Sequence, residues 1–284
     1  MSQLTSGFTK LLSLRSFQKM PVATTCRAIA WTLFHTLPKR HALVEIPVNG
    51  TSFKLDLPPL SRQGGSAGVY LQRQYYEPLL EYCATLVKPG DVVFDVGANQ
   101  GIYACAFAAL VGPSGRVIAF EPQDYAIRAL RNNAQLNGFN QITVQQAAVS
   151  DQAGWADLDV SHGAVSASIV RDFGGRTATK VPTVTLASVA EKLSITKVNV
   201  IKMDIEGAEL LALKGGEALL KRYKPTVVLE ATPDDAASNW FAIVDLLTGH
   251  GYAAYLFDVE GRLKRITDLV HWNKHYPNVV FVAP

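Results

Sequence analysis

An apolar run that ends in a carboxylate and a glycine turn is the first place in this chain where chemistry is expected. The stretch VVFDVGANQG, residues 92–101, places Asp95 near the end of a strand and Gly97 and Gly101 in the turn that follows. Glycine allows tight turns and close approach of a ligand to the backbone. Ligands of open α/β sheets bind beyond the carboxyl ends of the strands. The stretch therefore predicts a cofactor site, with a purely structural strand–turn–helix as the alternative.

The order of residues in this turn disfavours a dinucleotide. Dinucleotide-binding turns follow G-x-G-x-x-G, whereas here Asn99 stands in place of the central glycine and Asp95 precedes the first one. A carboxylate at that place repels a pyrophosphate resting on the helix N-terminus. It favours a ligand that carries an ammonium and a sulfonium group.

Acidic residues after the next two strands indicate an adenosine. Glu121 lies 20 residues after Gly101, a spacing at which a carboxylate accepts hydrogen bonds from both hydroxyls of an adenosine ribose. Capping of the next helix is the alternative for Glu121. Asp151, in AAVSD after the third strand, is predicted to accept a hydrogen bond from the adenine amino group, with a turn residue as the alternative.

Two further strands end in carboxylates that are predicted to face the reacting centre. Asp204 follows a strand in IKMDIEGAEL, and Glu230 closes the apolar strand VVLE, where packing alone explains a carboxylate poorly. Asp204 is expected to face a methionine amino group, the reacting centre or a metal. Asp204 and Glu230 together are candidate catalytic residues and candidate ligands of Mg²⁺. Glu209 is predicted instead to cap its helix.

A histidine is the alternative to these two carboxylates as the catalytic group that accepts a proton from the substrate. His271 and His275 lie between the last two expected strands, and His162 lies in an inserted loop. His271 is the catalytic candidate among them, and a surface or structural role is the alternative for each.

The elements that must position these residues alternate between strand and helix. Expected strands cover residues 92–96, 116–122, 142–149, 198–205, 225–231, 252–258 and 278–284, and expected helices cover 101–111, 124–138, 208–223 and about 236–249. Near-continuous apolar strands in such an alternation predict a parallel sheet covered on both faces. A hairpin is expected over 44–58, around Asn49-Gly50, and an interrupted helix over 68–87.

Residues 151–185 break this alternation. WADLDVS and TKVPTVT alternate with a period of two residues, and a Ser/Gly/Ala-rich stretch lies between them. They predict short extra strands and an inserted loop, which is where a substrate wall is often built.

Several of these stretches resemble one known family. GDVVFDVGANQGIYACAFA, VIAFEP, NAQLN, VPTVTLASV and IKMDIEGAELLALKGG resemble the FkbM family of S-adenosylmethionine-dependent methyltransferases, over about residues 70–231. The resemblance implies an α/β class I methyltransferase fold with a seven-stranded sheet in the order 3-2-1-4-5-7-6, the last strand antiparallel. It also implies O-methylation of a hydroxyl on a sugar, polyketide or related small molecule. Ala187 departs from the family, which commonly has an aspartate there.

Composition and charge limit the domain organisation and the partners that we expect. The chain of 284 residues is 48% hydrophobic and 18% charged, which suits one large globular domain or one domain with an appended segment. We expect a basic N-terminal extension with a small hairpin over 1–67, and the resemblance implies a methyltransferase domain over 68–284. Residues 1–44 contain six basic and no acidic residues. This extension is predicted either to meet an anionic membrane or acidic partner, or to pack on the domain as a solvated helix.

The cysteines, the length of the apolar runs and the motif content limit the compartments and partners that we expect. Three cysteines far apart predict reduced thiols in a cytoplasmic protein, and no apolar run reaches the length of a membrane span. No base-reading motif is present, so a nucleic-acid partner is not expected, and the acceptor is predicted to be a small molecule, sugar or glycolipid. The alternatives are a nicotinamide-dependent oxidoreductase and a non-catalytic cofactor-binding module docked by its basic leader.

Overall fold

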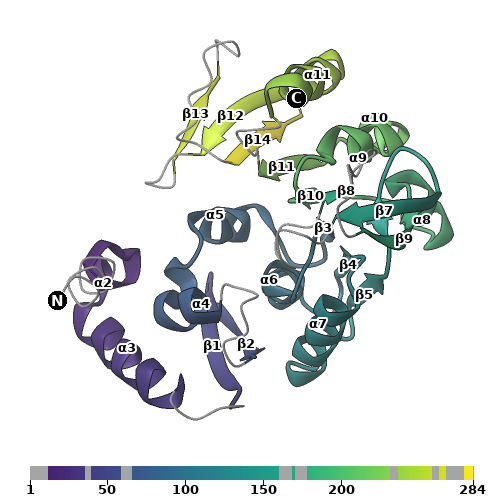
Figure 1. Cartoon of the computed structure of the whole chain (residues 1–284). Coiled ribbons are helices and arrows are strands. Elements are labelled where there is room, and N and C mark those ends of the chain that lie inside the picture. Colours follow the sequence, from purple (N-terminus) through teal and green to yellow (C-terminus); the bar gives the residue numbers. More distant parts are fainter. Residues whose placement is uncertain are drawn as a thin grey trace.

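The computed structural model in Figure 1 shows an α/β fold with an N-terminal helical segment at its side. The structure describes residues 12–35, 40–58, 66–159, 168–169, 178–230, 236–257, 262–266 and 278–283.

A mixed sheet of eight strands forms the centre of the described part of the chain. In spatial order its strands are β13 (Leu263–Arg265), β12 (Ala253–Phe257), β14 (Asn278–Val282), β11 (Thr226–Glu230), β10 (Val200–Met203), β3 (Val92–Val96), β4 (Arg116–Phe120) and β5 (Ile142–Gln145). β14 is antiparallel to β11 and β12. The prediction of seven strands misses β13, whose three residues are all exposed and carry no apolar pattern.

Helices cover both faces of this sheet, as the alternation predicted. One face packs against α5 (Pro78–Leu86), α6 (Ile102–Val111) and α7 (Asp124–Leu136). The other packs against α8 (Leu186–Lys192), α9 (Glu209–Gly215), α10 (Glu217–Tyr223) and α11 (Ala236–Gly249). The single helix expected over 208–223 is thus two helices. Within β3, Val93 faces the first core and Phe94 the second, because successive side chains of a strand point to opposite faces.

The predicted hairpin is confirmed and belongs to the first core. β1 (Ala42–Val48) and β2 (Thr51–Leu57) pair around Asn49 and Gly50, which both have positive φ. The inward residues of both strands are buried in the core that contains α6. The backbone N–H of Asp56 donates to Asn133 Oδ1 of α7 at 2.8 Å, which attaches the hairpin to that helix. The division of the chain at residue 67 remains a prediction.

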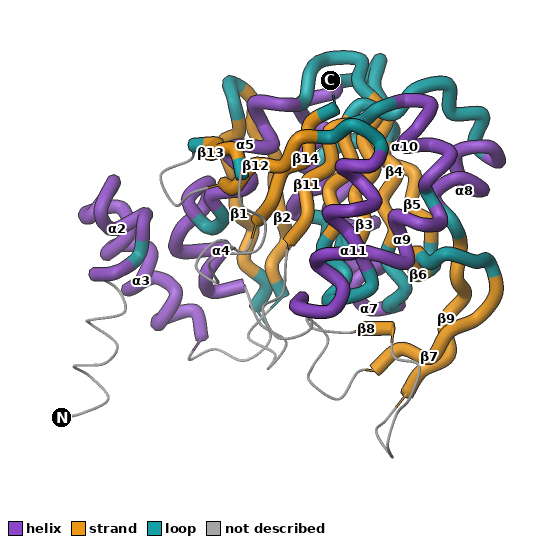
Figure 2. Tube along the Cα trace, turned by 90° about the horizontal axis from the view of Figure 1, so that it is seen from above, coloured by secondary structure: helices purple, strands orange, loops and turns teal. Residues whose placement is uncertain are grey.

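The N-terminal segment is helical and packs against the helix that follows the hairpin. It consists of α2 (Arg15–Lys19) and α3 (Pro21–His35), and both contact α4 (Ser66–Gln72), which leads into the 3₁₀ turn η1 (Arg73–Tyr75). The interruption predicted near Pro78 is confirmed, since α5 begins there. Figure 2 shows α2 and α3 as an outer layer next to α4, at the end of the molecule opposite to α8. Among the described residues, no helix combines the length and hydropathy needed to cross a membrane.

The inserted region forms a second, smaller sheet. The strand expected over 142–149 divides into β5 of the central sheet and β6 (Ala148–Val149) of this second one. β6 pairs with β9 (Ala178–Val184), which pairs with β7 (Gly154–Asp159), and β7 pairs with β8 (Ser168–Ile169). The two short strands predicted from period-two alternation are therefore present as β7 and β9.

Candidate functional site

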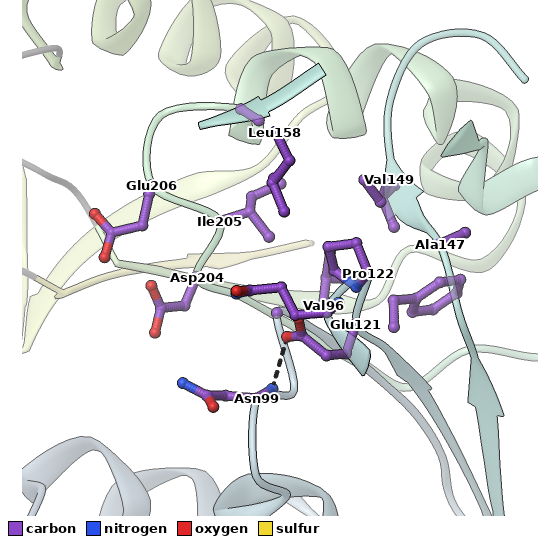
Figure 3. Close-up of a pocket in the computed structure, with 15 residues that line it drawn as sticks. Val96, Asn99, Glu121, Pro122, Ala147, Val149, Leu158, Asp204, Ile205 and Glu206 are labelled. Atoms are coloured by element: carbon purple, nitrogen blue, oxygen red, sulfur yellow. Dashed lines mark hydrogen bonds between the residues drawn. The ribbon is translucent and has the colours of Figure 1, made fainter. Parts of the chain in front are cut away.

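Three predicted site residues meet because their strands end at the same edge of the sheet. Val96 is in register with Phe120 on one side and with Met203 on the other. The next residue of each strand is therefore brought to one place, and these residues are Gly97, Glu121 and Asp204. All three line one pocket, which Figure 3 shows with Asp204 and Glu206 at one end and Ala147 and Val149 at the other.

This first pocket has a volume of about 590 Å³ including its open mouth, within the range of roughly 300–1,000 Å³ that is typical of ligand sites. Its lining combines one acidic end with an apolar wall. The residues are Val96, Gly97, Asn99, Phe120, Glu121, Pro122, Gln123, Ala147, Ala148, Val149, Leu158, Asp204, Ile205, Glu206 and Ala208.

Gly97 is a glycine because another loop approaches it too closely for a side chain. Its φ is +82°, and a Cβ there would lie 1.9 Å from the backbone oxygen of Asp204. The backbone N–H of Gly97 donates to the carbonyl of Phe120 at 3.0 Å, and that of Asp204 donates to Val96 at 3.0 Å. The glycine turn is thus fixed between the ends of β4 and β10, which leaves its backbone open to a ligand.

Glu121 is held by the turn that it faces. Its two carboxylate oxygens accept the backbone N–H groups of Asn99 at 3.0 Å and Gln123 at 2.9 Å, and the first of these bonds is dashed in Figure 3. Each oxygen keeps a second lone pair, so the carboxylate can still accept two ligand hydroxyls. Burial raises the pKa of Glu121 to about 7, although both N–H donors lower it.

The wall opposite these acids suits a flat apolar ring. Ala147, Ala148 and Val149, at the start of the second sheet, line the pocket together with Leu158 of β7. Ala148 and Val149 are both buried in this wall. The first pocket therefore offers an apolar slot beside a carboxylate that has lone pairs left for ligand hydroxyls, a combination that fits the chemistry of an adenosine.

A second pocket of about 710 Å³ adjoins the first and shares Gly97, Asn99 and Asp204 with it. Residues that precede β3 in the chain close this second pocket, among them Ser66 and Val69 of α4. The remaining lining residues are Leu57, Tyr76, Glu77, Ala98, Gln100, Ile102, Tyr103 and Lys202. Tyr76 reaches this lining, whereas the centre of the Tyr70 ring lies 4.9 Å from that of Trp31.

Lys202 is the main functional side chain that sequence reasoning missed. It is buried in β10, and its Nζ lies 3.3 Å from Asp204 Oδ2 and 4.5 Å from the centre of the Tyr103 ring. Burial alone would lower the pKa of Lys202, but four carboxylates outweigh it and raise that pKa above its ordinary value. These carboxylates belong to Asp204, Asp95, Glu77 and Glu230.

Glu77 and Tyr103 complete the polar floor of the second pocket. The Tyr103 hydroxyl donates to Glu77 Oε2, and both side chains are buried. Burial raises the pKa of Glu77, while the Tyr103 hydrogen bond and Lys202 oppose the shift. The floor thus joins a cation, a phenol and carboxylates within reach of one ligand.

Glu230 lies next to Asp204 across the sheet. Met203 is in register with Leu229, so the following residues, Asp204 and Glu230, are neighbours at the carboxyl edge. Burial and the charge of Asp204 raise the pKa of Glu230, whereas Lys202 lowers it. The pKa of Glu230 rises to about 8, so the group is a stronger base than an ordinary carboxylate and becomes available to accept a proton as the pH rises through that value.

The donor set around Asp204 and Glu230 does not fit the predicted Mg²⁺. Within the described ranges, no group of three or more His, Cys, Asp or Glu side chains is placed to hold a metal ion. The Lys202 ammonium already lies against Asp204 and would repel a divalent cation there. The prediction of Asp204 and Glu230 as magnesium ligands is therefore not supported.

Glu230 and three other predicted residues, Asp95, Gly101 and Asp151, lie outside the lining of the two pockets. Asp95 is fully buried opposite Lys202 in the sheet register, and no described residue hydrogen-bonds to its carboxylate. Burial raises the pKa of Asp95 to about 6, against the effect of Lys202. Gly101, with a φ of +91°, begins α6 and packs against Leu130. Asp151 accepts a hydrogen bond from Ser150 at 3.1 Å and lines a separate hollow with Trp155.

The remaining predictions concern the candidate histidines and the helix-capping residue Glu209. His271, together with His275 and His162, lies outside the described residues. Glu209 was predicted to cap its helix, and its Oε1 accepts the backbone N–H of Ile205 at 3.1 Å, next to the first turn of α9.

The chain matches a known methyltransferase domain in sequence. The family profile described as Methyltransferase FkbM domain matches residues 95–254, more than half of the chain. The 31-O-demethyl-FK506 methyltransferase FkbM of Streptomyces tacrolimicus is 33% identical over 196 residues, which cover 58% of this chain and 74% of that protein. The hexuronic acid methyltransferase AglP of Haloferax volcanii is 28% identical over 125 residues, 44% of this chain and about half (49%) of that protein.

A solved structure of a methyltransferase FkbM from Methylobacillus flagellatus is also similar, with 18% identity and a TM-score of 0.45 over 76% of this chain and 53% of that chain. The extent of the profile match, together with 33% identity over most of a curated FkbM, is what assigns the family. This chain belongs to the FkbM family of methyltransferases.

Proposed function

We propose that this protein transfers a methyl group from S-adenosylmethionine to a hydroxyl group of a small molecule or glycan. The observation that carries the proposal is the position of Glu230, a largely buried carboxylate with a raised pKa beside Asp204 at the carboxyl edge of the sheet. A hydroxyl must lose its proton to become a good nucleophile, and a basic carboxylate at this edge is suited to take it.

The first pocket is assigned to the adenosine of the cofactor. Glu121 would accept hydrogen bonds from the two ribose hydroxyls, and the wall of Ala147, Ala148 and Val149 would contact the adenine ring. Asn99, whose Oδ1 is buried without a hydrogen-bond partner in the described structure, would accept a further bond from the ligand. Asp151 is retained as a predicted adenine contact only on the ground of its sequence position.

The second pocket is assigned to the methionine part. Asp204 lines both pockets and is placed to attract the amino group, while the Lys202 ammonium would attract the carboxylate. Asp95 would act from behind the lining, through the negative charge that it adds to this region. When bound, S-adenosylmethionine supplies a methyl group activated by its positively charged sulfur.

The chain's own residues then orient the acceptor and remove one proton. With S-adenosylmethionine bound, the acceptor oxygen would form its bond to the methyl carbon as the carbon–sulfur bond breaks, and the role of the Glu230 carboxylate would be to take the hydroxyl proton. The products are a methyl ether and S-adenosylhomocysteine. In-line placement of the two reactants supplies the remaining rate enhancement.

We infer the chemical class of the acceptor from the names of two relatives and from the polar residues of the site. One relative's name specifies an O-demethyl substrate and another's a hexuronic acid. We therefore propose a polyketide-like or sugar hydroxyl as the acceptor of this protein.

The test is a methylation screen in which S-adenosylhomocysteine release is measured with hexuronic acids, glycans and macrolides, with and without EDTA. We expect methyl ether formation with at least one acceptor and no loss of rate with EDTA. Glu230→Gln should lower kcat by roughly 100-fold or more while the affinity for S-adenosylhomocysteine changes little.

Glu191→Gln, an exposed carboxylate of α8, is the matched control and should leave both quantities unchanged. Methylation at nitrogen, or full activity of the Glu230 variant, would contradict the proposal. Retention of NAD instead of S-adenosylhomocysteine would favour the oxidoreductase alternative.

A further inference from the structure

Helix α3 presents an unusual stripe of exposed apolar side chains. Val22 is 77% exposed, Ile29 57% and Leu33 64%, and the exposed Cys26 lies between them. At 3.6 residues per turn, these four positions fall within an arc of about 60° on one side of the helix. An exposed apolar face that repeats once per turn is typical of a helix that contacts an apolar environment.

The opposite side of α3 fixes the direction in which this stripe points. Thr24 and Trp31 are buried there, and the Trp31 ring lies 4.9 Å from the ring of Tyr70 in α4. Arg27 Nη1 also donates to the Leu71 carbonyl at 3.2 Å. Because these contacts hold the helix by its other face, the stripe points away from the body of the protein. Figure 2 shows α3 in the outer layer of the molecule.

The charge around the stripe is of one sign. The first 44 residues contain six basic and no acidic side chains. Arg15 is paired with Glu81 at 3.3 Å and Arg27 with a backbone carbonyl, so these two serve packing. Lys19 at the end of α2 and Arg40 after α3 are exposed and flank the stripe in sequence. The stripe is therefore bordered along the chain by exposed cations.

We infer that α3 lies flat on an anionic lipid surface, with Val22, Cys26, Ile29 and Leu33 at the boundary between headgroups and acyl chains. A helix of 15 residues is about 22 Å long, which is shorter than the hydrocarbon core of roughly 30 Å, so it lies on the bilayer and does not cross it. A second copy of this chain would bring an equally basic border against the first, whereas anionic lipid neutralises it.

The experiment uses the full chain and two readouts. Cosedimentation is measured with vesicles of phosphatidylcholine alone and with vesicles that contain phosphatidylglycerol. Because Cys83 and Cys105 are buried, an environment-sensitive dye can be attached to Cys26 within the stripe. We expect binding and a blue shift of the dye with the anionic vesicles, and weaker binding as the salt concentration rises.

The decisive variant is Val22→Gln/Ile29→Gln/Leu33→Gln, read by cosedimentation without the dye. Binding to anionic vesicles should fall by roughly tenfold or more, while thermal unfolding and S-adenosylhomocysteine affinity stay unchanged. Phe241→Gln, which replaces a 47% exposed apolar residue on α11, is the matched control and should bind vesicles like the parent chain.

Three outcomes would overturn the inference. They are the absence of vesicle binding, equal binding by the triple variant, and a dimer in sedimentation velocity that the triple variant abolishes while vesicles have no effect. The last of these would assign the stripe to a second copy of the chain.

Discussion

The buried ammonium of Lys202 lies 3.3 Å from the carboxylate of Asp204, and the two side chains come from positions two apart at the end of β10. Asp204 reaches both pockets, whereas Lys202 lines only the second. The cation thus compensates the acid that is shared between the proposed adenosine and methionine sites of the cofactor. Removing it would leave several buried carboxylates without their counter-charge.

Lys202→Met should therefore destabilise the protein in a pH-dependent way. Breaking a buried ion pair from one side costs about 3–5 kcal/mol. Lys202 lowers the pKa values of Asp95, Glu77 and Glu230, so its loss raises them, and the deficit should shrink as the pH falls and these groups become protonated. Urea unfolding at pH 5 and pH 8 measures the difference. Lys202→Arg keeps the charge and should recover most of the stability; a deficit independent of pH would contradict this account.

Glu121→Gln should weaken binding of S-adenosylhomocysteine. The substitution keeps the shape and one acceptor oxygen, but it replaces charge-assisted hydrogen bonds to the ribose by neutral ones. We expect a Kd higher by roughly 10- to 100-fold in isothermal titration calorimetry. Glu191→Gln serves as the control, and an unchanged Kd for the Glu121 variant would remove Glu121 from the cofactor site.

The same substitution should change how stability depends on pH in the ligand-free protein. Burial raises the pKa of Glu121 from 4.5 to about 7, so the folded state binds the proton more tightly than the unfolded state. The resulting stability is fully present below pH 4.5 and is lost as the pH rises through 7. Glutamine has no such proton. The stability of Glu121→Gln relative to the parent chain should therefore rise by up to about 3 kcal/mol between pH 4.5 and pH 8. Chemical denaturation across this range measures it, and a constant difference would show that Glu121 is not a buried acid.

Gly97→Ala should disrupt the site more than an ordinary glycine substitution. The added Cβ would lie 1.9 Å from the backbone oxygen of Asp204, in a backbone conformation with φ of +82°. We expect a loss of at least about 3 kcal/mol and of measurable S-adenosylhomocysteine binding. Gly138→Ala is the control, because its φ is +67° and nothing lies within 4 Å of the added Cβ, so backbone strain alone should cost about 1–2 kcal/mol. Equal losses in the two variants, measured by thermal unfolding, would mean that the contact with Asp204 is not what requires glycine.

The sequence predicted the sheet edge well because strand ends and glycines have strong local signals. Gly97, Glu121 and Asp204 follow apolar strands directly, and parallel strands bring such positions together. β13 escaped prediction because its three residues are exposed. The strand over 142–149 was not divided, although Gln145 and Gln146 interrupt its apolar pattern where the chain passes from one sheet to the other.

The polar floor was missed because its partners are distant in sequence. A lysine between apolar residues in VIKM must find buried partners, which was a usable signal for Lys202. That one partner would be Glu77, 125 residues earlier and attached to Tyr103, depends on how α5 and α6 pack, and no local pattern contains it.

Helix α6 is apolar around nearly its whole circumference, and eight of its ten residues are buried. The sheet can cover only one side of such a helix, and strand β2 of the hairpin contacts the other. The practical consequence concerns fragment design for expression. A fragment that starts near residue 40 retains this cover. One trimmed to residue 68, the predicted start of the methyltransferase domain, would expose an apolar helix to solvent and should precipitate.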